Sequence, residues 1–104
     1  MKKSMLALAT ALLFVAGGAA AADPVAGKTK FETCLGCHGI DKWVNAYPTF
    51  LVPKLAGQHE DYLVAALKAY SDGSRPHQTM HANAASLSEE DIADIAAFLS
   101  QLKP

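Results

Sequence analysis

The residues best suited to chemistry stand together at Cys34-Leu35-Gly36-Cys37-His38. The spacing C-x-x-C-H is typical of c-type haem attachment. In a helical turn, residues at i, i+3 and i+4 share one face, so both sulfurs and the imidazole would point the same way. Each thiol could then add to one vinyl group of the porphyrin while the imidazole reaches the iron. This segment therefore predicts one covalently bound haem c.

Two cysteines separated by two residues also occur in other kinds of site. A redox-active dithiol uses the same gap, but it is expected beside strands and helices that alternate, and no convincing strand pattern is present here. A structural zinc site needs four ligands, and a second cysteine pair is missing. A local disulfide stays open in an oxidising compartment, but it would not explain how so short a chain fills its core.

The first 22 residues predict a cleaved export signal. Lys2 and Lys3 give a positive start, Met5 to Val15 form an apolar run, and the alanines ending at Ala22 offer a cleavage site. An uncleaved anchor is the alternative, but the run is shorter than the roughly 20 residues of a spanning helix. We therefore expect a signal peptide at 1–22, one domain at 23–104, and a periplasmic protein without stable membrane insertion.

The mature domain would be weakly acidic. The whole chain has 9 basic and 10 acidic residues, and loss of Lys2 and Lys3 leaves 7 basic residues against the same 10 acidic ones, a net charge of −3. This balance argues against nucleic acid as a partner, because nucleic acid selects strongly basic surfaces. We expect a monomer that makes transient contacts with other proteins.

A second iron ligand should come from a distant part of the chain. Met1 and Met5 leave with the signal peptide, so Met80 is the one methionine of the mature domain. A lone methionine often only fills a gap in a core. Met80, however, lies far from His38 along the chain, and a thioether is a ligand that suits ferrous iron. We predict that His38 and Met80 both bind the iron.

Two histidines flank Met80 and are the alternatives to it. His77 or His81 could bind the iron instead and give a bis-histidine centre of lower reduction potential. His59 is most simply a residue that faces solvent. If Met80 is the ligand, then Cys34, Cys37, His38 and Met80 should line one apolar cavity.

Hydropathy patterns predict three helices and favour an all-α domain. The helices cover Pro24 to about Thr33, about His59 to Tyr70, and the stretch that follows Ser88. Ser88 and Asp91 predict a capping box at the start of the third helix. The stretches 39–57 and 74–86 lack such periodicity, and irregular segments of that length usually have a function. Here they would wrap around the ligand.

The mature chain resembles the small bacterial class I cytochromes c over nearly all of its length. Besides the attachment motif, the matching features in order are Gly27 with Phe31, Pro53 to Gln58, Tyr62 to Tyr70, Met80, and Leu87 to Ile92. The resemblance implies an all-α class I cytochrome c fold, with three main helices and long loops around one haem. It also implies a soluble electron carrier between redox proteins rather than an enzyme.

Two contacts follow from the resemblance. The carbonyl oxygen of Pro53 should accept a hydrogen bond from Nδ1 of His38, which would orient the imidazole and strengthen it as a ligand. Pro53 could otherwise simply break the loop. The first and last helices should cross where small and aromatic residues meet, at Gly27, Phe31, Ile95 and Phe98.

The chain departs from shorter members of that family at Ile40 to Leu51. Trp43, Tyr47 and Phe50 in this stretch could wall the haem and bind its propionates, or they could simply fill space. Arg75 is a further candidate for a propionate, although an exposed arginine is the commoner outcome. A peroxidase or a gas-binding module would instead need an open sixth position on the iron.

Overall fold

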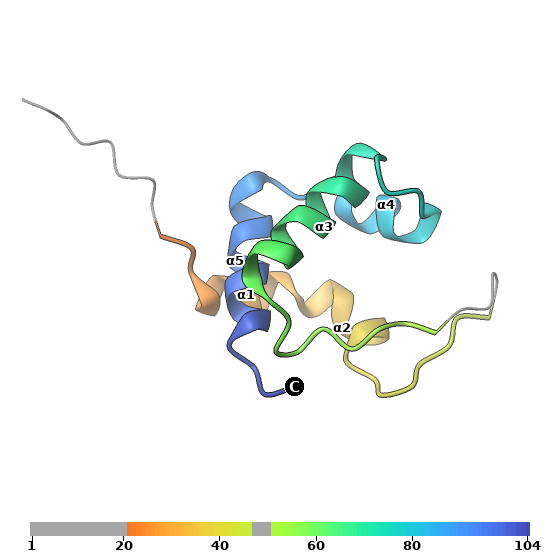
Figure 1. Cartoon of the computed structure of the whole chain (residues 1–104), viewed down its shortest axis with the longest axis horizontal. Coiled ribbons are helices and arrows are strands. Elements are labelled where there is room, and N and C mark those ends of the chain that lie inside the picture. Colours follow the sequence, from red (N-terminus) through yellow and green to blue (C-terminus); the bar gives the residue numbers. More distant parts are fainter. Residues whose placement is uncertain (1–20, 47–50) are drawn as a thin grey trace, which may run out of the picture.

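The computed structural model describes residues 21–46 and 51–104, so the predicted signal peptide falls almost wholly outside it, as do Tyr47 and Phe50. Within these ranges the chain forms five helices (Figure 1), namely α1 (Pro24–Lys30), α2 (Glu32–His38), α3 (Glu60–Asp72), α4 (Gln78–Ala84) and α5 (Glu89–Ser100). Strand pairing in the described part of the chain is limited to one isolated antiparallel bridge between Val44 and Leu51. The prediction of an all-α domain is confirmed.

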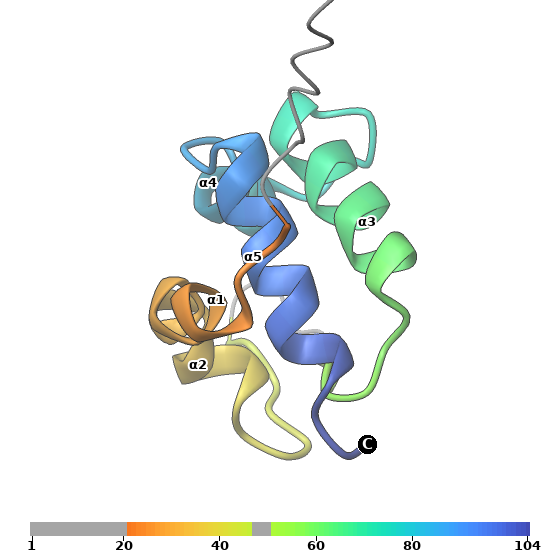
Figure 2. The same cartoon turned by 90° about the vertical axis from the view of Figure 1, so that its left-hand side faces the viewer.

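The first and last helices cross as the resemblance implied. Figure 2 looks roughly along α1, which lies against the side of α5. The backbone of Gly27 approaches α5 so closely that a Cβ there would collide with the carbonyl oxygen of Asp94. One turn later the rings of Phe31 and Phe98 pack at a tilt, with centroids 5.9 Å apart. Glycine is therefore required at this crossing by the distance between the two backbones.

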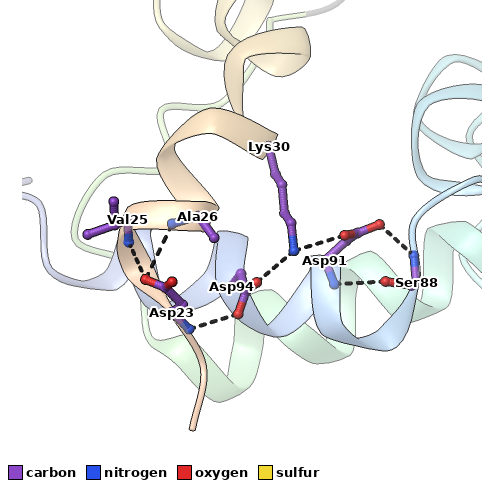
Figure 3. A network of polar contacts seen from close by, with 7 residues as sticks. All are labelled: Asp23, Val25, Ala26, Lys30, Ser88, Asp91 and Asp94. Atoms are coloured by element: carbon purple, nitrogen blue, oxygen red, sulfur yellow. Dashed lines mark hydrogen bonds and ion pairs between the residues drawn. The ribbon is translucent and has the colours of Figure 1, made fainter. Parts of the chain in front are cut away.

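A small apolar core joins α1, α3 and α5. Its fully buried members are Phe31, Leu63, Ile95, Ala96 and Leu99. Local residues define the end of α3 and the start of α5. Gly73 ends α3 in the left-handed conformation, with φ of 82°. Ser88 and Asp91 form the predicted capping box, since each side chain accepts a hydrogen bond from the other residue's backbone N–H (Figure 3).

The first predicted helix is divided in two at Phe31. α1 ends at Lys30 and α2 begins at Glu32, because the backbone N–H of Cys34 donates to the carbonyl of Phe31 and tightens the turn there. Phe31 is 5 % exposed and anchors this turn in the core. The break redirects the chain, so that α2 can leave the α1–α5 crossing while its residues stay helical.

Helix α4 lies in a stretch that we predicted to be irregular. It begins after His77, whose Nδ1 accepts a hydrogen bond from the backbone N–H of Met80 at 3.1 Å. Histidine is not among the residues that usually cap helices, so no start signal for α4 could be recognised. None of the helices in the described residues is long and apolar enough to cross a bilayer.

The close approach at Gly27 makes a prediction about stability. Gly27→Ala should lower the free energy of unfolding by about 1–3 kcal/mol, because the new methyl group meets rigid backbone that cannot turn aside. Thermal unfolding of the haem-loaded protein measures the loss. Gly36→Ala is the matched control, because a Cβ at Gly36 meets no neighbouring atom. Equal midpoints for the two variants would contradict the packing described for α1 and α5.

Candidate cofactor site

Helix α2 presents the three chemical groups of the attachment motif. Cys34, Cys37 and His38 occupy its last turn and a half, at i, i+3 and i+4, and all three side chains are half-buried. Both cysteines are free thiols. The described residues hold no group of three or more histidine, cysteine, aspartate or glutamate side chains arranged for a metal ion. The zinc alternative therefore gains no support from this part of the chain.

A hydrogen bond fixes the orientation of the His38 ring. Its Nδ1 lies 2.8 Å from the carbonyl oxygen of Pro53. A carbonyl oxygen can only accept, so Nδ1 carries the proton, and Nε2 of the neutral ring keeps its lone pair for a metal. The preceding residue, Val52, is buried and its N–H donates to the carbonyl of Trp43 at 2.8 Å. The loop is thus held in place on the cofactor side of α2, and the contact implied by the resemblance is confirmed.

A cavity of about 520 Å³ opens beside this ring. Its size falls in the range of sites that enclose a small organic ligand or cofactor. Cys34 and His38 line it from α2, and Met80 lines it from α4. Most of the remaining wall is apolar and comes from the loop after residue 50, α3 and α5, and includes Leu51, Val52, Leu55, Leu63, Ala66, Leu67, Ile95 and Leu99.

Three of the four predicted site residues therefore meet at one cavity. Cys37 is not among the residues that line it, although it lies on the same short helix as Cys34 and is equally half-buried. His38 belongs to α2 and Met80 to α4. In Figure 1, α2 lies towards the bottom of the molecule and α4 towards the top, so the two residues reach the cavity from separate helices.

The histidines near Met80 are engaged in other contacts. His81 is exposed and does not line the cavity, and its Nδ1 donates to the carbonyl of Tyr70 at 2.8 Å. His77 does line the cavity, but its Nδ1 accepts the bond from Met80 N–H. In the neutral ring the proton must then sit on Nε2, which leaves no lone pair there for iron. His59 is exposed at the start of α3, as expected.

A polar cluster that no sequence pattern predicted lies on the cavity wall and includes Arg75, the candidate for binding a propionate. The guanidinium of Arg75 lies over the ring of Tyr70, 4.7 Å from its centroid, and Nη1 donates to the hydroxyl of Tyr62 at 3.2 Å. The hydrogen bond to Tyr62 raises the pKa of Arg75 above its usual value. Trp43, by contrast, is 40 % exposed and does not line the cavity. Tyr62 and Tyr70 lie eight residues apart, or just over two helical turns, and this spacing was the signal that could have revealed the pair.

The cavity fits a haem by its chemistry. It offers an apolar wall, a neutral imidazole with a free Nε2, and a thiol on the same helix, and the cationic Arg75 stands at its wall. An apolar enclosure with few polar groups is what a flat, mostly hydrophobic macrocycle requires.

Comparisons with known proteins agree with this reading. A family model described as cytochrome c matches residues 24–103. Cytochrome c-554(548) of Halomonas halodenitrificans is 46 % identical over 83 residues, which cover 77 % of this chain and 96 % of that protein. Cytochrome c-554(547) of Halothiobacillus neapolitanus is 32 % identical over 95 residues, covering 80 % of this chain and 100 % of that protein.

A longer relative is also similar. Cytochrome c4 of Pseudomonas aeruginosa is 39 % identical over 103 residues, which cover 99 % of this chain but 50 % of that protein, so the chain spans about half its length. The family model and the small relatives, together with the single attachment motif, decide the classification. The chain belongs to the cytochrome c family, as a monohaem class I member that transfers electrons through one covalent haem c and is not an enzyme.

Proposed function

We propose that Cys34 and Cys37 would hold the haem through thioether bonds and that His38 and Met80 would be the two ligands of its iron. The observation that carries this assignment is the shared cavity, which His38 and Met80 line from α2 and α4. When bound, haem supplies a one-electron couple between ferrous and ferric iron. His38 contributes Nε2 as a ligand, and the Pro53 carbonyl keeps the ring in the required tautomer.

The residues of the cavity wall would influence the reduction potential of the haem iron. Apolar side chains such as Leu63, Leu67 and Ile95 line it and keep water away, which disfavours the additional positive charge of the ferric state. The thioether of Met80 acts in the same direction. If His38 and Met80 both remain bound, the surrounding protein would need little rearrangement when the iron is reduced or oxidised.

The chain would be exported and processed before it works. The predicted signal occupies 1–22, and the match to the family model begins at residue 24, directly behind the predicted cleavage point. This agreement supports cleavage after Ala22 and a periplasmic location. The mature domain, with a net charge of −3, would meet other redox proteins through small, short-lived contacts in which charge sets the rate of encounter.

Two measurements on the exported protein test the proposal together. Mass spectrometry should find a chain that begins at Asp23 and carries the mass of one haem. The reduced protein at neutral pH should bind carbon monoxide slowly or not at all, because Met80 occupies the sixth position. Rapid, stoichiometric binding would contradict the ligand assignment and favour a gas-binding or peroxidase-like centre.

A further inference from the structure

Asp94 is a buried acid on the side of α5 that packs against α1. It is 3 % exposed, and both of its carboxylate oxygens are occupied (Figure 3). Oδ2 accepts from Nζ of Lys30 at 2.7 Å, and Oδ1 accepts from the backbone nitrogen of Asp23 at 2.8 Å. These bonds lower the pKa of Asp94, the one from Lys30 most. Asp94 therefore joins both ends of α1 to the last helix.

The charges around Asp94 do not balance in the unprocessed chain. Lys30 also pairs with Asp91, at 3.0 Å, so one ammonium serves two carboxylates. The carboxylate of Asp23 accepts from the N–H groups of Val25 and Ala26 and caps α1. The backbone nitrogen of Asp23 is an amide before cleavage and brings no charge to Asp94. A buried carboxylate is stabilised much better by a full positive charge than by an amide dipole.

The bond that we expect to be cut is the one that ends at this nitrogen. We propose that cleavage between Ala22 and Asp23 creates the missing charge, so that the new amino terminus forms an ion pair with Asp94 and fastens α1 to α5. This inference rests on the export and processing given under the proposed function. Nothing in the electron-transfer site itself depends on it.

The chemical step is a peptide hydrolysis carried out by a signal-processing protease. Water adds across the amide, the C–N bond between Ala22 and Asp23 breaks, and Ala22 leaves as the carboxylate end of the signal. The nitrogen of Asp23 becomes an amine, which binds a proton at neutral pH because an α-amino group has an ordinary pKa of about 7.7–8.0. Two ammonium groups, on Asp23 and Lys30, then face the carboxylates of Asp91 and Asp94.

Helix electrostatics explain why Asp23 suits this position. A positive charge at the beginning of a helix opposes the helix dipole. The carboxylate of Asp23 is on the same residue and already caps the first turn of α1, so it offsets the charge of its own amino group. A cut one residue earlier would leave Asp23 N as an amide and move the ammonium to Ala22. The inference therefore depends on the register of cleavage.

The ion pair predicts a definite pH dependence. The charged groups of this network are the carboxylate of Asp94, which bonds the nitrogen of Asp23 directly, the carboxylate of Asp23 itself, and, connected through Asp94, the ammonium of Lys30 and the carboxylate of Asp91. Three of these four are negative, so the pKa of the amino group should be raised in the folded protein. Its stabilising effect is then fully present below pH of about 7.7 and is lost as the pH rises through the raised folded pKa.

The test compares two haem-loaded proteins whose first residues are verified by mass spectrometry. One begins at Asp23, and the matched control begins at Ala22 and is otherwise identical. An NMR titration gives the pKa of each α-amino group, and unfolding by denaturant from pH 6 to pH 11 gives stability. We expect the pKa of the Asp23 amine to be raised by at least about one unit, which corresponds to a roughly tenfold larger folding equilibrium constant near neutral pH.

The control fixes the interpretation. The Ala22 amine should keep an ordinary pKa, and the stability advantage of the chain that begins at Asp23 should vanish at high pH. Asp94→Asn should abolish both effects in the shorter chain. An ordinary pKa for the Asp23 amine, or identical stability profiles for the two chains, would overturn the ion pair. A natural terminus other than Asp23 would overturn the cleavage register, while the haem mass and the carbon monoxide test report separately on the proposed function.

Discussion

Replacing Cys34 and Cys37 together with alanine should leave a chain that retains no haem stably and is largely unfolded. The haem-binding cavity has a volume of about 520 Å³ and lies against the small core formed by Phe31, Leu63, Ile95, Ala96 and Leu99. At about 24 cal/mol per Å³, a rigid empty cavity of this size would cost up to about 12 kcal/mol. That upper limit is comparable with the entire stability of an ordinary domain, about 5–15 kcal/mol. The chain should therefore collapse or unfold when the cofactor is lost.

Circular dichroism and the visible absorption of the exported variant measure this result. The matched controls are the two single variants, each of which keeps one thiol on α2 and should retain some haem through one thioether bond and His38. A double variant with a helical spectrum and a sharp thermal transition would show that the polypeptide folds without its cofactor. It would thereby contradict the role assigned to the cavity.

Met80→Ala should open one face of the iron and lower the reduction potential. The thioether favours ferrous iron, so its loss favours the ferric state, and the vacated position becomes available to water or carbon monoxide. Spectroelectrochemistry gives the reduction potential. Binding of carbon monoxide to the reduced protein should change from slow or absent to rapid and stoichiometric.

The neighbouring histidines provide the controls. His81→Ala should leave the potential and the carbon monoxide reaction unchanged, because His81 is exposed, does not line the cavity and is bonded to the carbonyl of Tyr70. His77→Ala removes the cap of α4 and should cost about 0.5–2 kcal/mol of stability without opening the iron. If either histidine variant opens the iron and Met80→Ala does not, the ligand has been assigned to the wrong residue.

Local signals in the sequence were sufficient for several elements. Asp23 and Pro24 are typical start signals of a helix, and the side chain of Asp23 caps α1. Ser88 and Asp91 predict the start of α5 in the same way. These features could be predicted because each depends on residues within one helical turn. The attachment motif on α2 could be predicted for the same reason, because its residues also lie within about one helical turn.

Other features depend on contacts between distant segments. Two of them, the approach of Gly27 to α5 and the bond from His38 to Pro53, were predictable through the family resemblance and not from local pattern. α4 was missed because its cap is an unusual residue, His77. The pairing of Lys30 with Asp94 was missed as well, because the two residues are 64 positions apart and no local pattern connects them.

The crossing of α1 and α5 has a kinetic consequence. The bond between Asp23 and Asp94 joins residues 71 positions apart. When this bond forms, it closes nearly the whole domain into one loop. Closing a flexible loop of that length costs roughly 4 kcal/mol of chain entropy, and contacts of such long range slow folding. A chain that emerges from its N-terminal end therefore stays open until its last helix has followed. If the chain is exported as proposed, Cys34 and Cys37 would remain accessible during that interval, and their thiols would have time to react before the domain folds around them.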